Sequence, residues 1–111
     1  MTYTLFPSLA AAEARVAVDR LFTVRLPSPP FRICLVRRTD GSWRAFEDMC
    51  PHKKAPFSKG GYLNAEGEVV CPLHNYLFEL DTGQETSGQS CPHLPLFPVL
   101  IDDKGLHVKV Y

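Results

Sequence analysis

The 111-residue sequence lacks an excess of charge, a long apolar run and more than a few metal-binding side chains. Twelve Lys and Arg balance twelve Asp and Glu, so no basic arm can neutralise a row of phosphates, and a nucleic-acid partner is not expected. The longest apolar runs, such as PLFPVLI (residues 95–101), fall far short of a bilayer span. The first residues also lack the basic start of a signal peptide, so we expect a cytoplasmic protein with reduced thiols and no membrane association.

Ten prolines and seven glycines separate short stretches rich in β-branched and aromatic residues. This pattern predicts one all-β domain over residues 1–111, a small antiparallel sandwich or barrel. Residues 31–47 resemble a hairpin with its turn at residues 39–41, and the only predicted helix covers residues 8–14. The expected strands cover residues 21–26, 31–38, 42–47, 67–71, 76–80, 96–101 and 106–111.

Two of the four cysteines and two of the four histidines lie between residues 50 and 74, as Cys50-x-His52 and Cys71-x-x-His74. Two thiolates and two imidazoles suit either one tetrahedral zinc or a 2Fe–2S cluster with thiolates on one iron and imidazoles on the other. Zinc fingers commonly pair like ligands, whereas each loop here offers one of each kind. This arrangement favours the binuclear cluster, and a zinc-stapled interaction module is the alternative.

The two pairs and their flanks resemble the Rieske motif. Both "CPH..AP.S.G" (from Cys50) and "CPLH...F.L.TG" (from Cys71) are present. The resemblance implies that Cys50 and Cys71 bind the inner iron of one 2Fe–2S cluster and that His52 and His74 bind the outer iron. It also implies a Rieske domain whose cluster-binding tip is formed by two loops, at about residues 50–60 and 71–78.

The resemblance also bears on the reduction potential. Imidazole ligands place Rieske clusters at roughly −150 to +300 mV, against about −400 mV for plant-type clusters. High-potential respiratory members carry two hydroxyl side chains where this chain has Tyr76 and Phe78, and a disulfide where it has Ala55 and Leu73. Neither position after the second histidine offers a serine-like hydroxyl, so we expect a low-potential, ferredoxin-like protein.

Two departures from the ferredoxin pattern lie in the loops, where Lys54 and Asn75 replace glycines that are common in the family. A second CPH, at Cys91 to His93, falls in the loop that covers the cluster in this family, and we expect it to cover the site and not to bind metal. Cys34, inside an apolar run, is expected to be a buried small side chain.

The resemblance implies a one-electron carrier that takes electrons from a reductase and passes them to a terminal oxygenase or similar enzyme. An alternative is the small Rieske subunit of an assimilatory nitrite reductase. Only His93 and His107 follow His74, too few for the mononuclear iron site of an oxygenase, so no catalytic site of its own is expected. Trp43 and Phe46 are expected in the core, and His107 as a surface or hydrogen-bonded residue.

Overall fold

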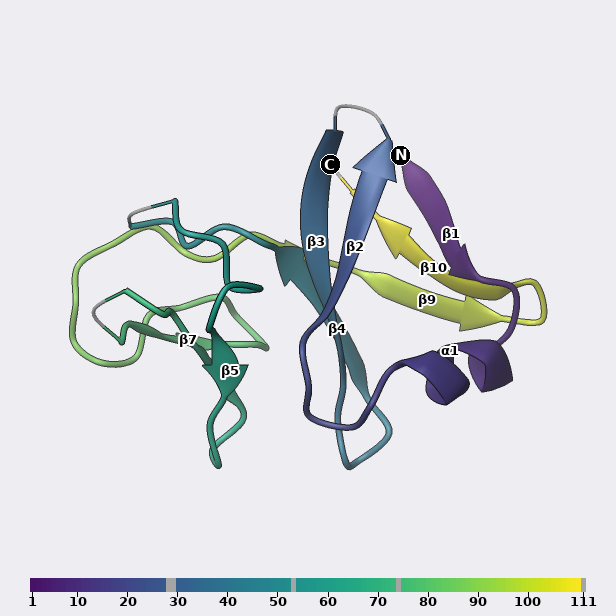
Figure 1. Cartoon of the computed structure of the whole chain (residues 1–111), viewed down its shortest axis with the longest axis horizontal. Coiled ribbons are helices and arrows are strands. Elements are labelled where there is room, and N and C mark those ends of the chain that lie inside the picture. The colour runs from purple at the N-terminus through teal and green to yellow at the C-terminus, as the bar shows by residue number, and fades with distance from the viewer. Residues whose placement is uncertain (28–29, 53, 74, 111) are drawn as a thin grey trace.

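The computed structural model describes residues 1–27, 30–52, 54–73 and 75–110, and folds them into short strands and one helix (Figure 1). The predicted all-β class is therefore confirmed. The elements are β1 (Thr2–Phe6), α1 (Leu9–Arg15), β2 (Phe22–Pro27), β3 (Pro30–Arg37), β4 (Trp43–Glu47), β5 (Tyr62–Leu63), β6 (Glu68–Val70), β7 (Leu77–Glu79), β8 (Leu96–Phe97), β9 (Val99–Asp102) and β10 (Gly105–Lys109).

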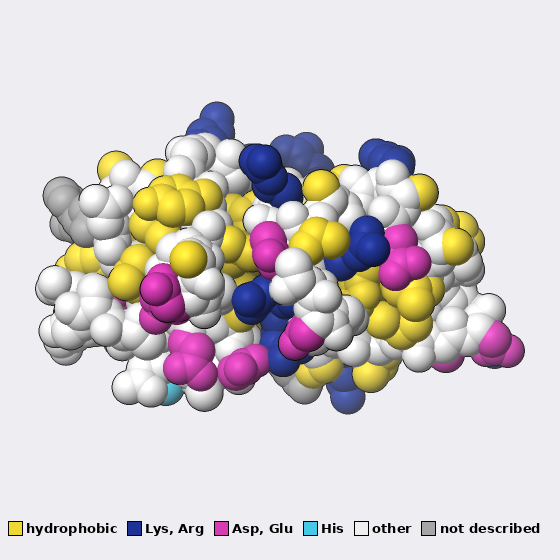
Figure 2. Space-filling model, turned by 90° about the horizontal axis from the view of Figure 1, so that it is seen from below, with side chains coloured by type: hydrophobic (Ala, Val, Ile, Leu, Met, Phe, Trp, Pro, Cys, Tyr) yellow, Lys and Arg dark blue, Asp and Glu magenta, His cyan; other side chains and the backbone are white. Residues whose placement is uncertain are grey.

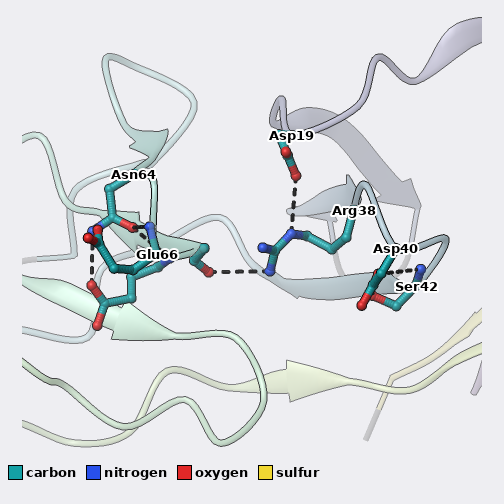
Figure 3. A network of polar contacts seen from close by, with 8 residues as sticks. Asp19, Arg38, Asp40, Ser42, Asn64 and Glu66 are labelled. Atoms are coloured by element: carbon teal, nitrogen blue, oxygen red, sulfur yellow. Dashed lines mark hydrogen bonds and ion pairs between the residues drawn. The ribbon is translucent and has the colours of Figure 1, made fainter.

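The described residues form three antiparallel sheets, in the strand orders β1-β10-β9, β2-β3-β4-β8 and β5-β6-β7. The predicted hairpin is the β3–β4 pair, with register from Ile33 opposite Glu47 to Arg37 opposite Trp43. Its turn is closed by Asp40, whose carboxylate accepts hydrogen bonds from the backbone N–H and hydroxyl of Ser42 (Figure 3).

The middle of β3 is buried on both faces of the β2-β3-β4-β8 sheet, which explains its four consecutive apolar residues, Ile33 to Val36. Ile33 and Leu35 face one core, shared with the β1-β10-β9 sheet and α1. Cys34 and Val36 face a second core, which they share with the segment that carries the Cys/His pairs. Of the two predicted core aromatics, Trp43 joins the first core and Phe46 the second, so both predictions are confirmed.

Sequence reasoning missed β1 and the two-residue β5, and misjudged one strand. β1 lies at the start of the chain and is held by pairing with β10, from Thr2 opposite Lys109. The expected strand over 96–101 is divided at Pro98, which has no N–H to donate to a ladder, into β8 and β9 in different sheets. The helix begins one residue later than predicted, because Ser8 caps it by accepting a hydrogen bond from the Ala11 N–H at 3.0 Å.

Residues 48–95, between β4 and β8, form what we call the insert lobe, seen on the left of Figure 1. Its two ends meet on one sheet, since β4 and β8 pair directly. Arg38 at the end of β3 also contacts it: the guanidinium reaches Asp19 Oδ1 at 3.1 Å on one side and the Gly67 carbonyl at 3.5 Å on the other (Figure 3). A Cβ on Gly67 would lie 2.3 Å from this guanidinium, so glycine leaves room for the contact.

Charges of both signs lie on the surface of the described residues. Figure 2 shows acidic and basic side chains interspersed over one face of a chain whose net charge is zero. None of the helical residues that the structure describes forms a segment long and apolar enough to cross a bilayer.

Candidate metal centre

The insert lobe brings together three of the four predicted ligands. The Sγ atoms of Cys50 and Cys71 and a ring nitrogen of His52 all lie within 4.8 Å of one another. Cys50 Sγ is 2.8 Å from His52 Nδ1, and both cysteines are fully buried. Within the described ranges this is the one group of Cys, His, Asp or Glu side chains arranged to hold a metal. The fourth predicted ligand, His74, lies outside the described residues, so the four-ligand set stays a prediction.

Tight turns point these side chains at one spot. In the first loop the Cys50 N–H donates to the Ala55 carbonyl at 2.7 Å, and the Lys54 N–H donates to the Cys50 carbonyl at 2.6 Å. In the second loop the Cys71 N–H donates to the Tyr76 carbonyl at 2.8 Å. Each turn places one residue in the left-handed region, Lys54 at φ 57° and Asn75 at φ 56°. These are the two positions where glycine is common in the family, so the substitutions keep a conformation that glycine adopts without strain.

Tyr76 takes a role that the sequence did not reveal. Its ring stacks on the imidazole of His52, with centroids 3.7 Å apart and planes 14° from parallel. Tyr76 comes from the second loop and His52 from the first, so the contact joins the two loops. Phe78, the other position compared with respiratory members, is fully buried and packs edge-on against Phe57 at 6.0 Å.

The chemistry of the donor atoms fits an iron–sulfur site. Burial raises the pKa of the Cys71 thiol to about 11, and the hydrogen bond that this thiol makes to Cys50 acts in the same direction. The buried Cys71 thiol therefore loses its proton more readily when a cation compensates the charge, as ferric iron does. Thiolates and imidazole are also the ligand types of a Rieske centre.

The third loop of the insert lobe contains the second CPH, Cys91 to His93. Cys91 is half-buried against the same core as Cys50 and Cys71, and its thiol donates to the Pro92 carbonyl at 3.3 Å. Neither Cys91 nor His93 belongs to the metal-binding group found among the described residues. Leu94, which follows this loop, packs closely on Gly83. A Cβ at Gly83 would lie 2.3 Å from the Leu94 carbonyl oxygen, so glycine leaves room for this contact.

Glu85, on the approach to this loop, is buried and accepts hydrogen bonds from the backbone N–H groups of Leu77, Ser87 and Gln89, at 2.9, 3.0 and 2.8 Å. Burial alone would raise the pKa of Glu85, but these bonds and one from the Ser87 hydroxyl outweigh burial and lower it. Leu77 adjoins Tyr76, so Glu85 connects the third loop to the second.

The structure also tests two predictions about residues outside the loops, Cys34 and His107. Cys34 is fully buried as expected, but its thiol additionally donates to Asp48 Oδ1 at 3.4 Å. Burial, followed by the nearby Asp48 carboxylate, raises the pKa of the Cys34 thiol, which keeps it protonated as a donor. His107 is hydrogen-bonded on both sides, with Thr4 Oγ1 and Asp102 Oδ1 each 2.8 Å from a ring nitrogen.

Comparison with known proteins supports this interpretation of the site. The Rieske 2Fe-2S domain model matches residues 9–98. The chain is 35% identical over 71 residues to a 3-phenylpropionate/cinnamic acid dioxygenase ferredoxin subunit of Photorhabdus laumondii, a match that covers 64% of this chain and 67% of that protein. It also matches oxygenases, but spans less than a fifth of their length.

Solved structures share the fold. The ferredoxin of carbazole 1,9a-dioxygenase from Nocardioides aromaticivorans aligns with a TM-score of 0.72 and 24% identity, over 86% of this chain and 88% of that one. A structure described as an NADH-dependent nitrite reductase small subunit from Mycobacterium tuberculosis aligns with a TM-score of 0.76 and 22% identity, over 100% and 96%. At these identities the likeness concerns the fold alone.

Proposed function

Because this chain belongs to the Rieske 2Fe-2S domain family, we propose that it is a one-electron carrier. The observation that supports this most directly is the approach of two buried thiols and one imidazole to within 4.8 Å at the end of the insert lobe. When bound, a 2Fe–2S cluster supplies a site that accepts and releases one electron at a time. The residues of this chain would bind that cluster and determine the hydrogen bonds and exposure around it.

We assign Cys50 and Cys71 to one iron and His52 and His74 to the other. The cysteines are fully buried, whereas His52 is half-buried with its Nε2 shielded from solvent, so the imidazole lies nearer the surface than the thiols do. Tyr76 holds the His52 ring in one plane by stacking on it. The hydroxyl pattern of high-potential members is missing at positions 76 and 78, which supports a midpoint potential below about +100 mV.

The proposed partners are a reductase that donates the electron and an oxygenase or similar enzyme that accepts it. Support comes from the ferredoxin subunit that this chain resembles, which belongs to a dioxygenase by its name. The chain itself would have no catalytic site and would work in the cytoplasm. The nitrite reductase subunit differs in its partner and uses the same cluster chemistry, so it stays the alternative.

The decisive experiment is anaerobic purification of the full chain, followed by iron and sulfide analysis and electron paramagnetic resonance of the reduced protein. We expect two irons and two sulfides per chain and a Rieske-type signal that changes in His52→Cys and in His74→Cys. His93→Cys is the matched control and should leave the signal unchanged, since His93 is exposed in the third loop. Colourless protein with one zinc would instead support the zinc-stapled module, and the electron-carrier proposal would then be wrong.

A further inference from the structure

A buried carboxylate lies two residues before the first predicted ligand. Asp48 is 4% exposed, and its side chain has no exposed surface at all. An ionised carboxylate in such a place is unfavourable unless donors replace the water that it loses. Apolar packing does not explain this residue, because a carboxylate of this size adds little apolar contact.

Donors surround both oxygens of this carboxylate. Oδ1 accepts from the Ser58 N–H at 2.9 Å and from the Cys34 thiol at 3.4 Å. Oδ2 accepts from the Ser58 hydroxyl at 2.6 Å and pairs with Arg32 Nε at 3.3 Å. Arg32 and Cys34 belong to β3, on the sheet shared by both cores, whereas Ser58 lies at the far end of the first loop.

These contacts join the two ends of the first ligand loop. Asp48 and Ser58 are ten positions apart, and Cys50 and His52 lie between them. The carboxylate therefore joins the two ends of the loop to each other, and through Arg32 and Cys34 it joins both ends to the sheet. A loop fixed in this way holds its ligands with less loss of conformational freedom when metal binds.

From this geometry we propose that Asp48 is the positioning residue of the first ligand loop, and that Ser58 is its main partner. The proposal rests on the function proposed above, in which Cys50 and His52 bind the cluster. Asp48 acts through the loop: among the described residues its carboxylate bonds to Ser58, Cys34 and Arg32 and not to the side chain of a predicted ligand. Removing its charge should loosen the loop without exposing either core.

The test compares three variants of the full chain: Asp48→Asn, Ser58→Ala and the control Asp81→Asn. Asp81 is also a carboxylate paired with an arginine, at 2.7 Å from Arg44, but it is exposed and lies in a turn without a predicted ligand. The first readout is hydrogen–deuterium exchange of the amides at residues 50–58, which needs no bound cluster. The second readout is the rate at which an iron chelator bleaches the cluster, together with the line shape of the reduced paramagnetic signal.

Asp48→Asn should accelerate exchange in residues 50–58 by about tenfold or more, because it removes hydrogen bonds to a charged acceptor. It should also accelerate cluster loss by roughly 10- to 100-fold, as changes around metal ligands commonly do, and broaden the signal. Ser58→Ala should shift both readouts in the same direction by a smaller factor, and it provides the test if Asp48→Asn does not fold. Asp81→Asn should stay within about twofold of the parent protein.

Unchanged exchange at residues 50–58 in both loop variants would overturn the proposal. Faster exchange with an unchanged rate of cluster loss would overturn it as well, because the loop would then be ordered for a reason unrelated to the ligands. Absence of a 2Fe–2S cluster from the parent protein would refute the proposed function alone, since the exchange measurement would still decide whether Asp48 closes the loop.

Discussion

Replacing Lys54 by glycine should stabilise the protein, although it removes a side chain. Lys54 is held at φ 57°, where a residue with a Cβ is less stable by about 1–2 kcal/mol than in the right-handed region. Glycine avoids this cost but makes the unfolded chain more flexible, which offsets about 0.4–1 kcal/mol. The Lys54 side chain is exposed, so little contact is lost, and the net gain should be about 1 kcal/mol.

The assay is thermal unfolding of the cluster-free protein, which avoids coupling to loss of metal. An unfolding entropy of about 2.1 cal/mol/K per residue gives roughly 0.23 kcal/mol/K for a chain of this length, so a gain of 1 kcal/mol raises Tm by about 4 °C. Lys104→Gly is the control, because Lys104 lies in a turn but is not among the described residues with positive φ. It should lose about 0.4–1 kcal/mol for the same substitution.

The two lysine variants should change Tm in opposite directions, and this difference in sign is the test. If Lys54→Gly lowers Tm as much as Lys104→Gly does, the left-handed backbone at Lys54 is wrong, and so is the turn that aims Cys50 and His52. Asn75→Gly should gain less than Lys54→Gly, since asparagine tolerates this conformation better than lysine does.

Three further predictions concern the loops around the site. Tyr76→Phe should keep the cluster as stable as in the parent protein, whereas Tyr76→Leu, which loses the stacking on His52, should speed chelator-driven bleaching by about tenfold. The lowered pKa of Glu85 means that its carboxylate stabilises the fold above the ordinary glutamate pKa, and that this stabilisation is lost as pH falls through the lowered value. Glu85→Gln should therefore lose less stability than the parent protein between about pH 5 and pH 3, as measured by denaturant titrations at each pH. Gly83→Ala should reduce the free energy of unfolding by about 2 kcal/mol or more, because its Cβ would meet the Leu94 carbonyl at a positive φ, and equal stability would contradict that packing.

Much of the fold could be read from local patterns. The β3–β4 hairpin follows from two apolar runs around Thr39–Gly41, and the helix follows from its alanines, although the role of Ser8 as its cap was not predicted. β1 was missed because its stability comes from pairing with β10, at the opposite end of the sequence, which no local pattern shows. Pro98 did carry a signal, since a missing N–H predicts a break in a ladder.

The candidate site likewise has some features that the sequence predicts and others that it does not. Cys50, His52 and Cys71 could be predicted as ligands because ligand spacing is local, and the structure brings their side chains together, while their binding of metal stays a prediction. The stacking of Tyr76 on His52 depends on how two loops meet, and only the aromatic character of residue 76 hinted at it. Asp48 gave no signal in the sequence, because its partners come from β3 and from the far end of the loop.

The direct pairing of β4 with β8 has a consequence for how this architecture can be altered. All of the proposed redox machinery is carried by one excursion of the chain that leaves the sheet at one strand and returns on the adjacent strand. Such a segment can be exchanged between related scaffolds, provided that the graft retains the pairing of Ala45 with Phe97 and the apolar core contacts of Val36 and Phe46.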